Sequence, residues 1–472
     1  MTHLRILTPV VVDHYVVPGA PLRDPAAYAA FWAEAQGHVD ALLGARALNV
    51  DSPGPAVTLL HSTETSALNR YRSIGDGAVD RPLHVISGVL QPHHVQHHLD
   101  EPENPVLVGL RNVSFRLHDH GLMILEAVCD VSEYLTAHPD DVEARLDELQ
   151  EQAVETGDAL ASVVVAHYVD PVLTLLRDLD RGGDYLEPAT PSDDPQFSDF
   201  GHSLWVTRSL VVDPSEATAE RTVRHWIKDV ALTETSRPPA DEILDGERDH
   251  LVRWLNYLFY DRNGDGPDMQ PGSMFHDQWD ALRYAQVFYG SVDRIDSRLS
   301  RILADSASAD SRVELQRLKD DLTRLSRRAE LIILERQDLA KYLKRSVRLE
   351  LDALMGYWDY EQLLEEPVRF KIDLANQRLA ELGAQRTARS AMFTDVILLS
   401  IAMTSVLATA LALTEFGRSV ASDPNMAVYD FGRSSIVAWV ASQPADAILI
   451  SSGAVSALIV LVYLFFRRNN NS

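Results

Sequence analysis

The sequence is almost free of cysteine. Its 472 residues contain one, Cys129, so an intramolecular disulfide cannot form. Disulfides are common in exported proteins and rare in the cytosol, and this composition favours a reducing compartment. The N-terminal stretch MTHLRILTPVVVDHYVV also lacks a basic region followed by an apolar run and a small-residue cleavage site, so no signal peptide is expected.

Motifs typical of enzymes are missing as well. The chain shows no phosphate-binding glycine loop, no serine-hydrolase elbow and no paired catalytic carboxylates, and we therefore expect a protein that is not an enzyme.

Positive charge is scarce. There are 43 Lys and Arg residues against 69 Asp and Glu residues, a net charge of −26. This imbalance argues against nucleic acid or an anionic lipid surface as the main partner and favours cations or basic proteins. An acidic surface that is simply solvated is the alternative.

The C-terminal part has two long runs without charge. Val396–Leu413 contains 18 such residues and Ala447–Phe466 contains 20, each close to the length that a helix needs to cross a bilayer core of about 30 Å. The runs predict a two-helix transmembrane domain over 391–472, with spans at about 394–414 and 446–466. Buried core helices are the alternative.

Basic residues flank the two runs asymmetrically, with more of them before the first run and after the second than in the connecting segment. By the positive-inside rule, both termini should be cytosolic, in a multi-pass protein of the inner (plasma) membrane that contacts membrane lipid. The flanking residues are Lys371, Arg378, Arg386, Arg389, Arg467 and Arg468, against Arg418 and Arg433 between the runs.

The N-terminal part alternates short β-branched runs with helical patterns, an α/β arrangement expected over residues 1–250. Helices are expected at about Pro25–Leu43 and Asp140–Asp158, with another beginning near Pro214. The expected strands lie in RILTPVVVDHYVV, AVTLLHS, LHVISGVL, NPVLVGLRNVSFRLHDHGLMILEAVCDV and HSLWVTRSLVV, the fourth being two strands joined at His118 to Gly121.

From about residue 274 the pattern becomes helical. We expect helices over Met274–Ala304 and Val313–Glu365 and a third from Val368 through the first apolar run, with Pro367 breaking the second from the third. We expect these helices to form a coiled-coil stalk over 274–390, with apolar seams that pack on one another or on other subunits. The seam residues are Leu315, Leu318, Leu322, Leu325, Ala329 and Ile332, then Leu339, Leu343, Val347, Leu351 and Leu354.

This order of elements resembles the CorA-like family of divalent-cation channels and transporters. The matching features are an N-terminal α/β domain, two antiparallel helices, a stalk helix that becomes the first membrane helix, a second membrane helix and a short basic tail, FFRRNNNS. The family's Gly-Met-Asn signature is absent, because Glu415-Phe416-Gly417-Arg418-Ser419 stands in its place. The resemblance implies an α+β cytosolic domain, long stalk helices, two C-terminal transmembrane helices and a homo-oligomer, by resemblance a pentamer. Magnesium selectivity does not carry over.

The first apolar run has one narrow face of small and hydroxyl-bearing residues at 100° per residue. Around a symmetry axis this face would line a cation pathway, although small residues also allow close packing of membrane helices. The face comprises Asp395, Leu398, Ala402, Ser405, Thr409 and Ala412. In the second run Ser452, Gly453, Ser456 and Ala457 are expected to pack against the first.

The connecting segment Glu415–Ser434 carries EFGRS at one end and DFGRS at the other. We expect a re-entry turn with interfacial anchors at Phe416 and Phe431, and a carboxylate ring at Glu415 as its contribution to conduction. Asn425 is its one amide that resembles a family-type filter.

Two motifs resemble metal sites. PHHVQHHLDE places His93 with His97 and His94 with His98 at helical i,i+4 spacing, which suits a transition metal, and a solvated helix end is the alternative. In DRNGDGPD the first half of a calcium loop is present, with Gly272 where the bidentate carboxylate belongs, and a turn-rich loop is the alternative. The residues concerned are Asp261, Asn263 and Asp265. A divalent cation is the one cofactor considered.

Three functions follow from the sequence. The first is a CorA-like oligomeric channel or transporter for cations, gated by its cytosolic domain. The second is a membrane effector or signalling protein on the same scaffold, in which the N-terminal domain senses a ligand or partner. The third is a membrane-anchored scaffold that does not conduct.

Overall fold

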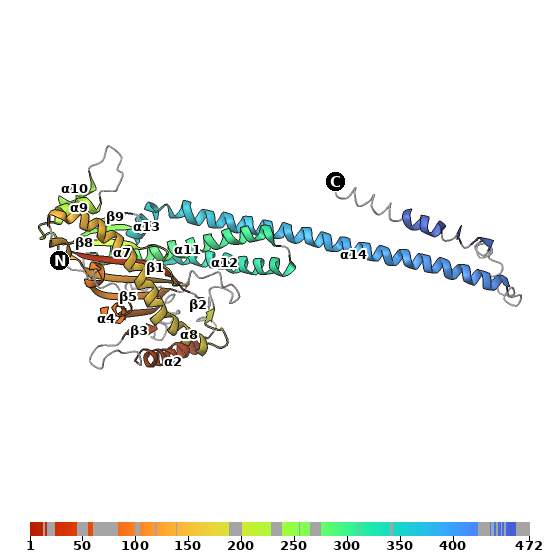
Figure 1. Ribbon diagram of the computed structural model, residues 1–472, viewed down its shortest axis with the longest axis horizontal. Helices are drawn as coiled ribbons and strands as arrows, with labels where there is room; N and C mark the ends of the chain where they lie inside the picture. The colour runs from red at the N-terminus through yellow and green to blue at the C-terminus, as the bar shows by residue number, and fades with distance from the viewer. Residues whose placement is uncertain are drawn as a thin grey trace. The chain divides into compact units, whose positions relative to one another are not determined.

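The computed structural model shows an α+β protein that is mostly helical, with one large mixed sheet (Figure 1). The residues described below are 1–12, 15–16, 24–44, 55–59, 84–99, 104–118, 120–137, 139–187, 201–227, 238–253, 255–264, 275–309, 311–339, 343–422, 435, 439, 442–444, 446–447 and 450–458.

The sheet has eight strands in the order β3-β4-β5-β6-β1-β8-β10-β9. Strand β10 runs parallel to β8 and the other neighbours are antiparallel. A separate pair is formed by β2 and β7. The strands are β1 His3–Val11, β2 Tyr15–Val16, β3 Ala56–Leu59, β4 His84–Leu90, β5 Leu110–His118, β6 Leu122–Asp130, β7 Leu186–Glu187, β8 Thr207–Val212, β9 His250–Val252 and β10 Asn256–Tyr260.

Strands β1 and β6 lie at the centre of the sheet and pair along their whole length, from His3 opposite Asp130 to Val11 opposite Leu122. Every residue of β1 is buried, because helices cover both faces, and a strand covered on both sides reads as a continuous apolar run. The expected hairpin at His118 to Gly121 is confirmed as the β5–β6 connection.

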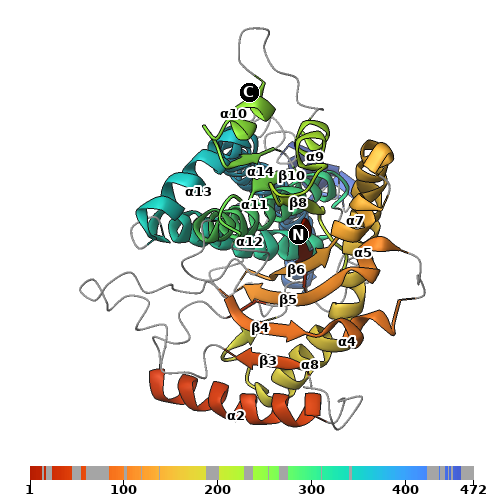
Figure 2. The same ribbon diagram turned by 90° about the vertical axis from the view of Figure 1, so that its left-hand side faces the viewer.

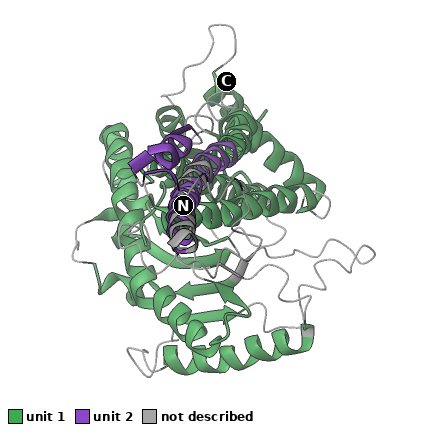
Figure 3. Ribbon diagram, turned by 90° about the vertical axis from the view of Figure 1, so that its right-hand side faces the viewer, with its two compact units in different colours: residues 1–375 green, residues 376–472 purple. Residues whose placement is uncertain are grey.

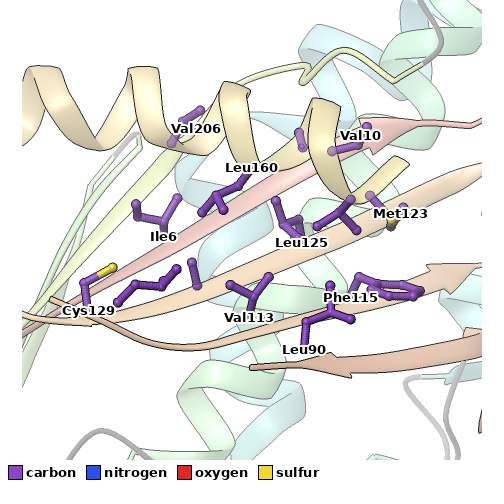
Figure 4. Packing of buried hydrophobic residues seen from close by; sticks show 14 of the residues in the cluster. Ile6, Val10, Leu90, Val113, Phe115, Met123, Leu125, Cys129, Leu160 and Val206 are labelled. Atoms are coloured by element: carbon purple, nitrogen blue, oxygen red, sulfur yellow. The ribbon is translucent and has the colours of Figure 1, made fainter. Parts of the chain in front are cut away.

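The first face of the sheet is covered by a long helical stretch, α7, a π-helical turn at Val165–Val169, and α8 (Figure 2). Its Leu160 packs with Ile6, Leu125 and Val206 in the main apolar core (Figure 4). The helices of this domain are α2 Pro25–Gly44, α4 Pro92–Gln96, α5 Pro105–Val108, α6 Ser132–Thr136, α7 Val142–Val164, α8 Asp170–Leu179, α9 Ala219–Trp226 and α10 Pro239–Leu244.

The second face carries α11, His276–Ser308, which contacts β1 and β6 and also packs against α12, Arg312–Leu339, and α13, Arg345–Tyr357. The two predicted apolar seams are buried at most of their positions, Leu318 and Leu343 being half-buried. Because α12 and α13 both contact α11, these seams find a partner within the chain.

The helix boundaries differ from the predicted ones. The expected helix Val313–Glu365 is three pieces, α12, α13 and a π-helical turn at Glu361–Glu365, and Asp359, with φ +49°, lies between the last two. Pro367 does not separate two helices as predicted, because α14, Glu366–Ser422, continues directly from the π-helical turn. Pro367 therefore lies inside a continuous helix, where its missing N–H removes one intrahelical hydrogen bond without ending the helix.

Helix α14 has 57 residues, about 85 Å at 1.5 Å per residue. The prediction of an unbroken helix from Val368 to Leu413 is therefore confirmed. The helix also continues through Glu415 to Ser422, so the connecting segment starts eight residues later than predicted. The chain divides into two compact units, residues 1–375 and 376–472 (Figure 3).

Membrane-spanning candidates are few in the described part of the chain. One helical stretch, Pro139–Leu179, is long and apolar enough by length and composition, and 50% of its apolar window is buried. It contributes Leu146, Leu160 and Leu176 to the core, which identifies it as the core helix of the α+β domain. Ile397–Ala412 within α14 is a shorter apolar helix.

Candidate conduction stripe and metal-binding residues

The predicted pore-lining residues all lie on α14 and all are exposed in the single chain. We call six of them the α14 stripe. Their spacing alternates between three and four residues, which keeps them on one face of a helix in a left-handed supercoil. The stripe consists of Asp395, Leu398, Ala402, Ser405, Thr409 and Ala412.

The hydroxyl groups of this helix donate back to its own backbone. Thr409 Oγ1 donates to the Ser405 carbonyl at 2.7 Å, and Thr404 Oγ1 donates to the Ser400 carbonyl at 2.8 Å. A hydroxyl that has used its proton in this way keeps lone pairs on its oxygen. On the α14 stripe, Thr409 can therefore offer an acceptor to a cation or to a water molecule.

Glu415 is also exposed, but it follows Ala412 by three residues where the alternating spacing calls for four. Phe416, 43% exposed, occupies the next stripe position. Glu415 thus lies on a helix and beside the stripe. Asn425 and Phe431 lie outside the described residues.

The described residues of the predicted second span, 446–447 and 450–458, are helical. Ser452 and Ser456 are buried, whereas Gly453 and Ala457 are exposed. Burial therefore differs along the four predicted positions, and packing of this face against the first run stays a prediction.

In the PHHVQHHLDE motif, ring contacts join histidines that are neighbours in the sequence. The ring centroids of His93 and His94 lie 4.1 Å apart, and those of His97 and His98 lie 3.6 Å apart. The His98 ring also stacks on His167 at 3.8 Å with an interplanar angle of 12°. Helix α4 ends at Gln96, so His97 and His98 lie in the following turn rather than on a helical face.

His167 was not among the candidates, because it lies 69 residues beyond His98 and belongs to the π-helical turn at Val165–Val169. No local spacing could have linked the two. Burial, His167 and His97 together lower the pKa of His98. Among the described residues, no three His, Cys, Asp or Glu side chains stand in an arrangement that would hold a metal ion as they are.

The calcium-like motif follows strand β10. Asp261 is buried and its N–H donates to the Val212 carbonyl at 2.9 Å. Arg262 and Asn263 form a turn, and Gly264 follows it with φ +70°. Asp265 lies outside the described residues.

A cluster of buried charged residues between the sheet and α11 was not predicted from the sequence. Glu126 on β6 contacts Arg5 on β1, Arg116 on β5 at 3.4 Å and Arg283 on α11 at 2.9 Å. Trp279 Nε1 donates to Glu126 at 3.1 Å, and the Arg5 guanidinium lies 4.0 Å from the centre of the Trp279 ring. We call these five residues the Glu126 cluster, and it joins the second face of the sheet to α11.

Burial alone would raise the pKa of Glu126, but Arg283, Arg5 and Arg116 outweigh it and hold the pKa well below its usual range. The arginine in β1 and the glutamate in β6 were signals for such a cluster, since charged residues in the central strands of a sheet require partners.

No family model, no curated protein and no solved structure matches this chain.

Proposed function

We propose that the protein is an oligomeric membrane protein that conducts cations along α14, in a CorA-like arrangement with two transmembrane helices and cytosolic termini. The observation that carries the proposal is the exposed stripe on one unbroken helix.

Helix α14 has one face covered and one face open. Near its start, Val368, Ala375 and Leu379 are buried, with exposed fractions of 0%, 1% and 1%. Phe370 and Leu374 are 66% and 40% exposed. A large apolar side chain gains about 1.5–3 kcal/mol when it is buried, so this open face favours association.

The open face continues in the same spacing as the α14 stripe. Steps of three and four residues lead from Phe370 and Leu374 to Asp395 and on to Ala412. Every described residue on this path is exposed. A sustained 3.5-residue period keeps one helix face turned toward the axis of a left-handed supercoil, and we infer that further copies of the same chain pack on this face.

The remaining apolar surface of α14 suits lipid. Ile397 and Ile401 are 44% and 60% exposed and lie off the stripe. Isoleucine is among the side chains that insert most favourably into a bilayer. A ring of α14 helices would then turn hydroxyls inward and isoleucines outward.

Negative charge supports cations as the conducted species. A pentamer would carry a formal charge of −130, five times the −26 of one chain. Such a field concentrates cations near the protein and weakens with salt. Asp395, at the N-terminal end of the stripe, would place a ring of carboxylates there.

A route for gating runs from the sheet to α14. Glu126 on β6 binds Arg283 on α11, and farther along α11 Asp296 accepts from Lys371 Nζ on α14 at 2.6 Å. A ligand that moved α11 on the sheet would change the position of α14 through these contacts.

The proposal is tested by reconstituting the full-length protein in liposomes, measuring cation flux and determining the mass of the detergent-solubilised oligomer. We expect flux and a mass of several chains. A monomer would exclude a pore of this kind. An oligomer without flux under every ionic condition would instead support the non-conducting scaffold, and flux that begins only after a cytosolic ligand is added would support the effector.

A further inference from the structure

We propose that His98 and His167, with His97 beside them, form a site for a transition-metal ion on the N-terminal domain. We call these three residues the histidine stack. The proposal does not rest on conduction, and it adds a residue, His167, that no sequence motif includes.

A hydrogen bond joins the segment of His94 to the segment of His167 beside the histidine stack. The buried Tyr168 hydroxyl, next to His167, donates to the His94 carbonyl at 2.8 Å. His94 Nδ1 in turn accepts from the Gln91 backbone N–H at 3.0 Å. These hydrogen bonds hold the segment that contains His98 close to the segment that contains His167.

His167 lies in a π-helical turn. A π-helix inserts an extra residue into a helix and is found mostly as a single turn, frequently at functional sites. Here it occupies Val165–Val169, with Tyr168 directed into the core and His167 half-buried beside His98.

The tautomer of His97 is one that can bind a metal ion. Its Nδ1 lies 2.8 Å from the His93 carbonyl, and since a carbonyl can only accept, Nδ1 carries the proton. In the neutral ring Nε2 then has the lone pair. Histidines that bind metals characteristically donate the other ring N–H to a carbonyl or carboxylate in this way.

His98 stacks on His167 and is tilted by 43° against His97, and this arrangement does not direct three nitrogens at one point. Binding requires the rings to turn edge-on toward an ion at about 2.0–2.1 Å from each nitrogen. His97 and His98 are exposed, so solvent rather than core side chains surrounds the rings that must turn.

Imidazole ligands determine the class of ion. Neutral imidazole suits Zn²⁺, Ni²⁺ and Cu²⁺, whereas Mg²⁺ and Ca²⁺ prefer oxygen ligands. We therefore expect the histidine stack to bind Zn²⁺ and not Mg²⁺, independently of which ion the protein conducts.

The experiment is a titration of the untagged full-length protein in detergent with ZnCl₂ by calorimetry, repeated with MgCl₂. We expect one site per chain for Zn²⁺, weakened more than about tenfold in His98→Gln and in His167→Gln. His38→Gln is the matched control, because His38 is a 52% exposed surface histidine on α2, and it should leave the affinity unchanged.

Electron paramagnetic resonance of bound Cu²⁺ supplies a second readout that does not depend on affinity. Hyperfine lines from at least two nitrogens should appear in the wild type and diminish in His167→Gln. Equal Zn²⁺ affinity in the wild type and in His167→Gln would overturn the proposal, as would the absence of Zn²⁺ binding in the wild type.

Discussion

Glu126 receives hydrogen bonds from Arg5, Arg116, Arg283 and Trp279 in a position that is 5% exposed. Removing one member of a buried ion pair leaves the other charges uncompensated, at a cost of about 3–5 kcal/mol. Glu126→Gln should lower the stability of the full-length protein by that amount, as measured by urea unfolding and tryptophan fluorescence. Glu220→Gln, in an exposed pair with Arg224, should change it by less than about 1 kcal/mol.

The same glutamate predicts a pH dependence. Because the folded-state pKa of Glu126 is lowered, its contribution is present above the unfolded-state pKa of about 4.3 and is lost as the pH falls through the folded-state pKa. The stability difference between the wild type and Glu126→Gln should be constant from pH 7 to about pH 5 and should shrink in stronger acid. A difference that shrank between pH 7 and 6 would point to another titrating group.

Two glycines on helices should respond to the same substitution with opposite signs. A Cβ on Gly157 of α7 would lie 2.8 Å and 2.9 Å from the Val206 methyls and 3.1 Å from Thr8 Oγ1, whereas a Cβ on Gly37 of α2 meets nothing within 4 Å. Gly157→Ala should destabilise by about 1–3 kcal/mol, and Gly37→Ala should stabilise by about 0.5–1 kcal/mol. Thermal unfolding of both variants checks the signs, and a stabilising Gly157→Ala would mean that α7 can move away from the sheet.

How well the sequence predicts the helices and strands depends on the range of the interactions that form them. The central strands and the α12 seam were predictable, because burial imposes an apolar pattern on each. Strand β10 was missed and extends the sheet to Tyr260, ten residues beyond the expected domain limit, since NYLFY is too short to distinguish a strand from other buried segments. The π-helical turns carry no sequence pattern, so the continuity past Pro367 and the position of His167 could not be predicted.

Helix α14 allows a direct comparison between its own stripe and the segment that follows it. If the stripe lines the pathway, Thr409→Val removes a hydroxyl acceptor and Asp395→Asn removes a charge, so both should reduce cation flux severalfold in liposomes. Asn425→Ala should leave selectivity unchanged. Loss of selectivity in Asn425→Ala with normal flux in the other two variants would place the filter after α14.

The basic residues that flank the two apolar runs predict that both ends of the chain face the cytosol. Reporter fusions at residues 1 and 472 should be active only as cytosolic reporters. Activity on the opposite side of the membrane at either end would overturn the topology on which the proposed pathway depends.

The central claim is that α14 lines a cation pathway with one face, and substituted-cysteine accessibility tests it most directly. The wild-type chain can serve as the unreactive starting protein, because its one cysteine, Cys129, is fully buried and burial raises the pKa of its thiol. Single cysteines are placed at Ala402, Ser405, Thr409 and Ala412, with controls on the opposite face at Leu407 and Leu411. A charged methanethiosulfonate reagent should block flux at the first four positions and leave flux at the two controls unchanged. Block at Leu407 and Leu411 without block at Ser405 and Thr409 would contradict the account.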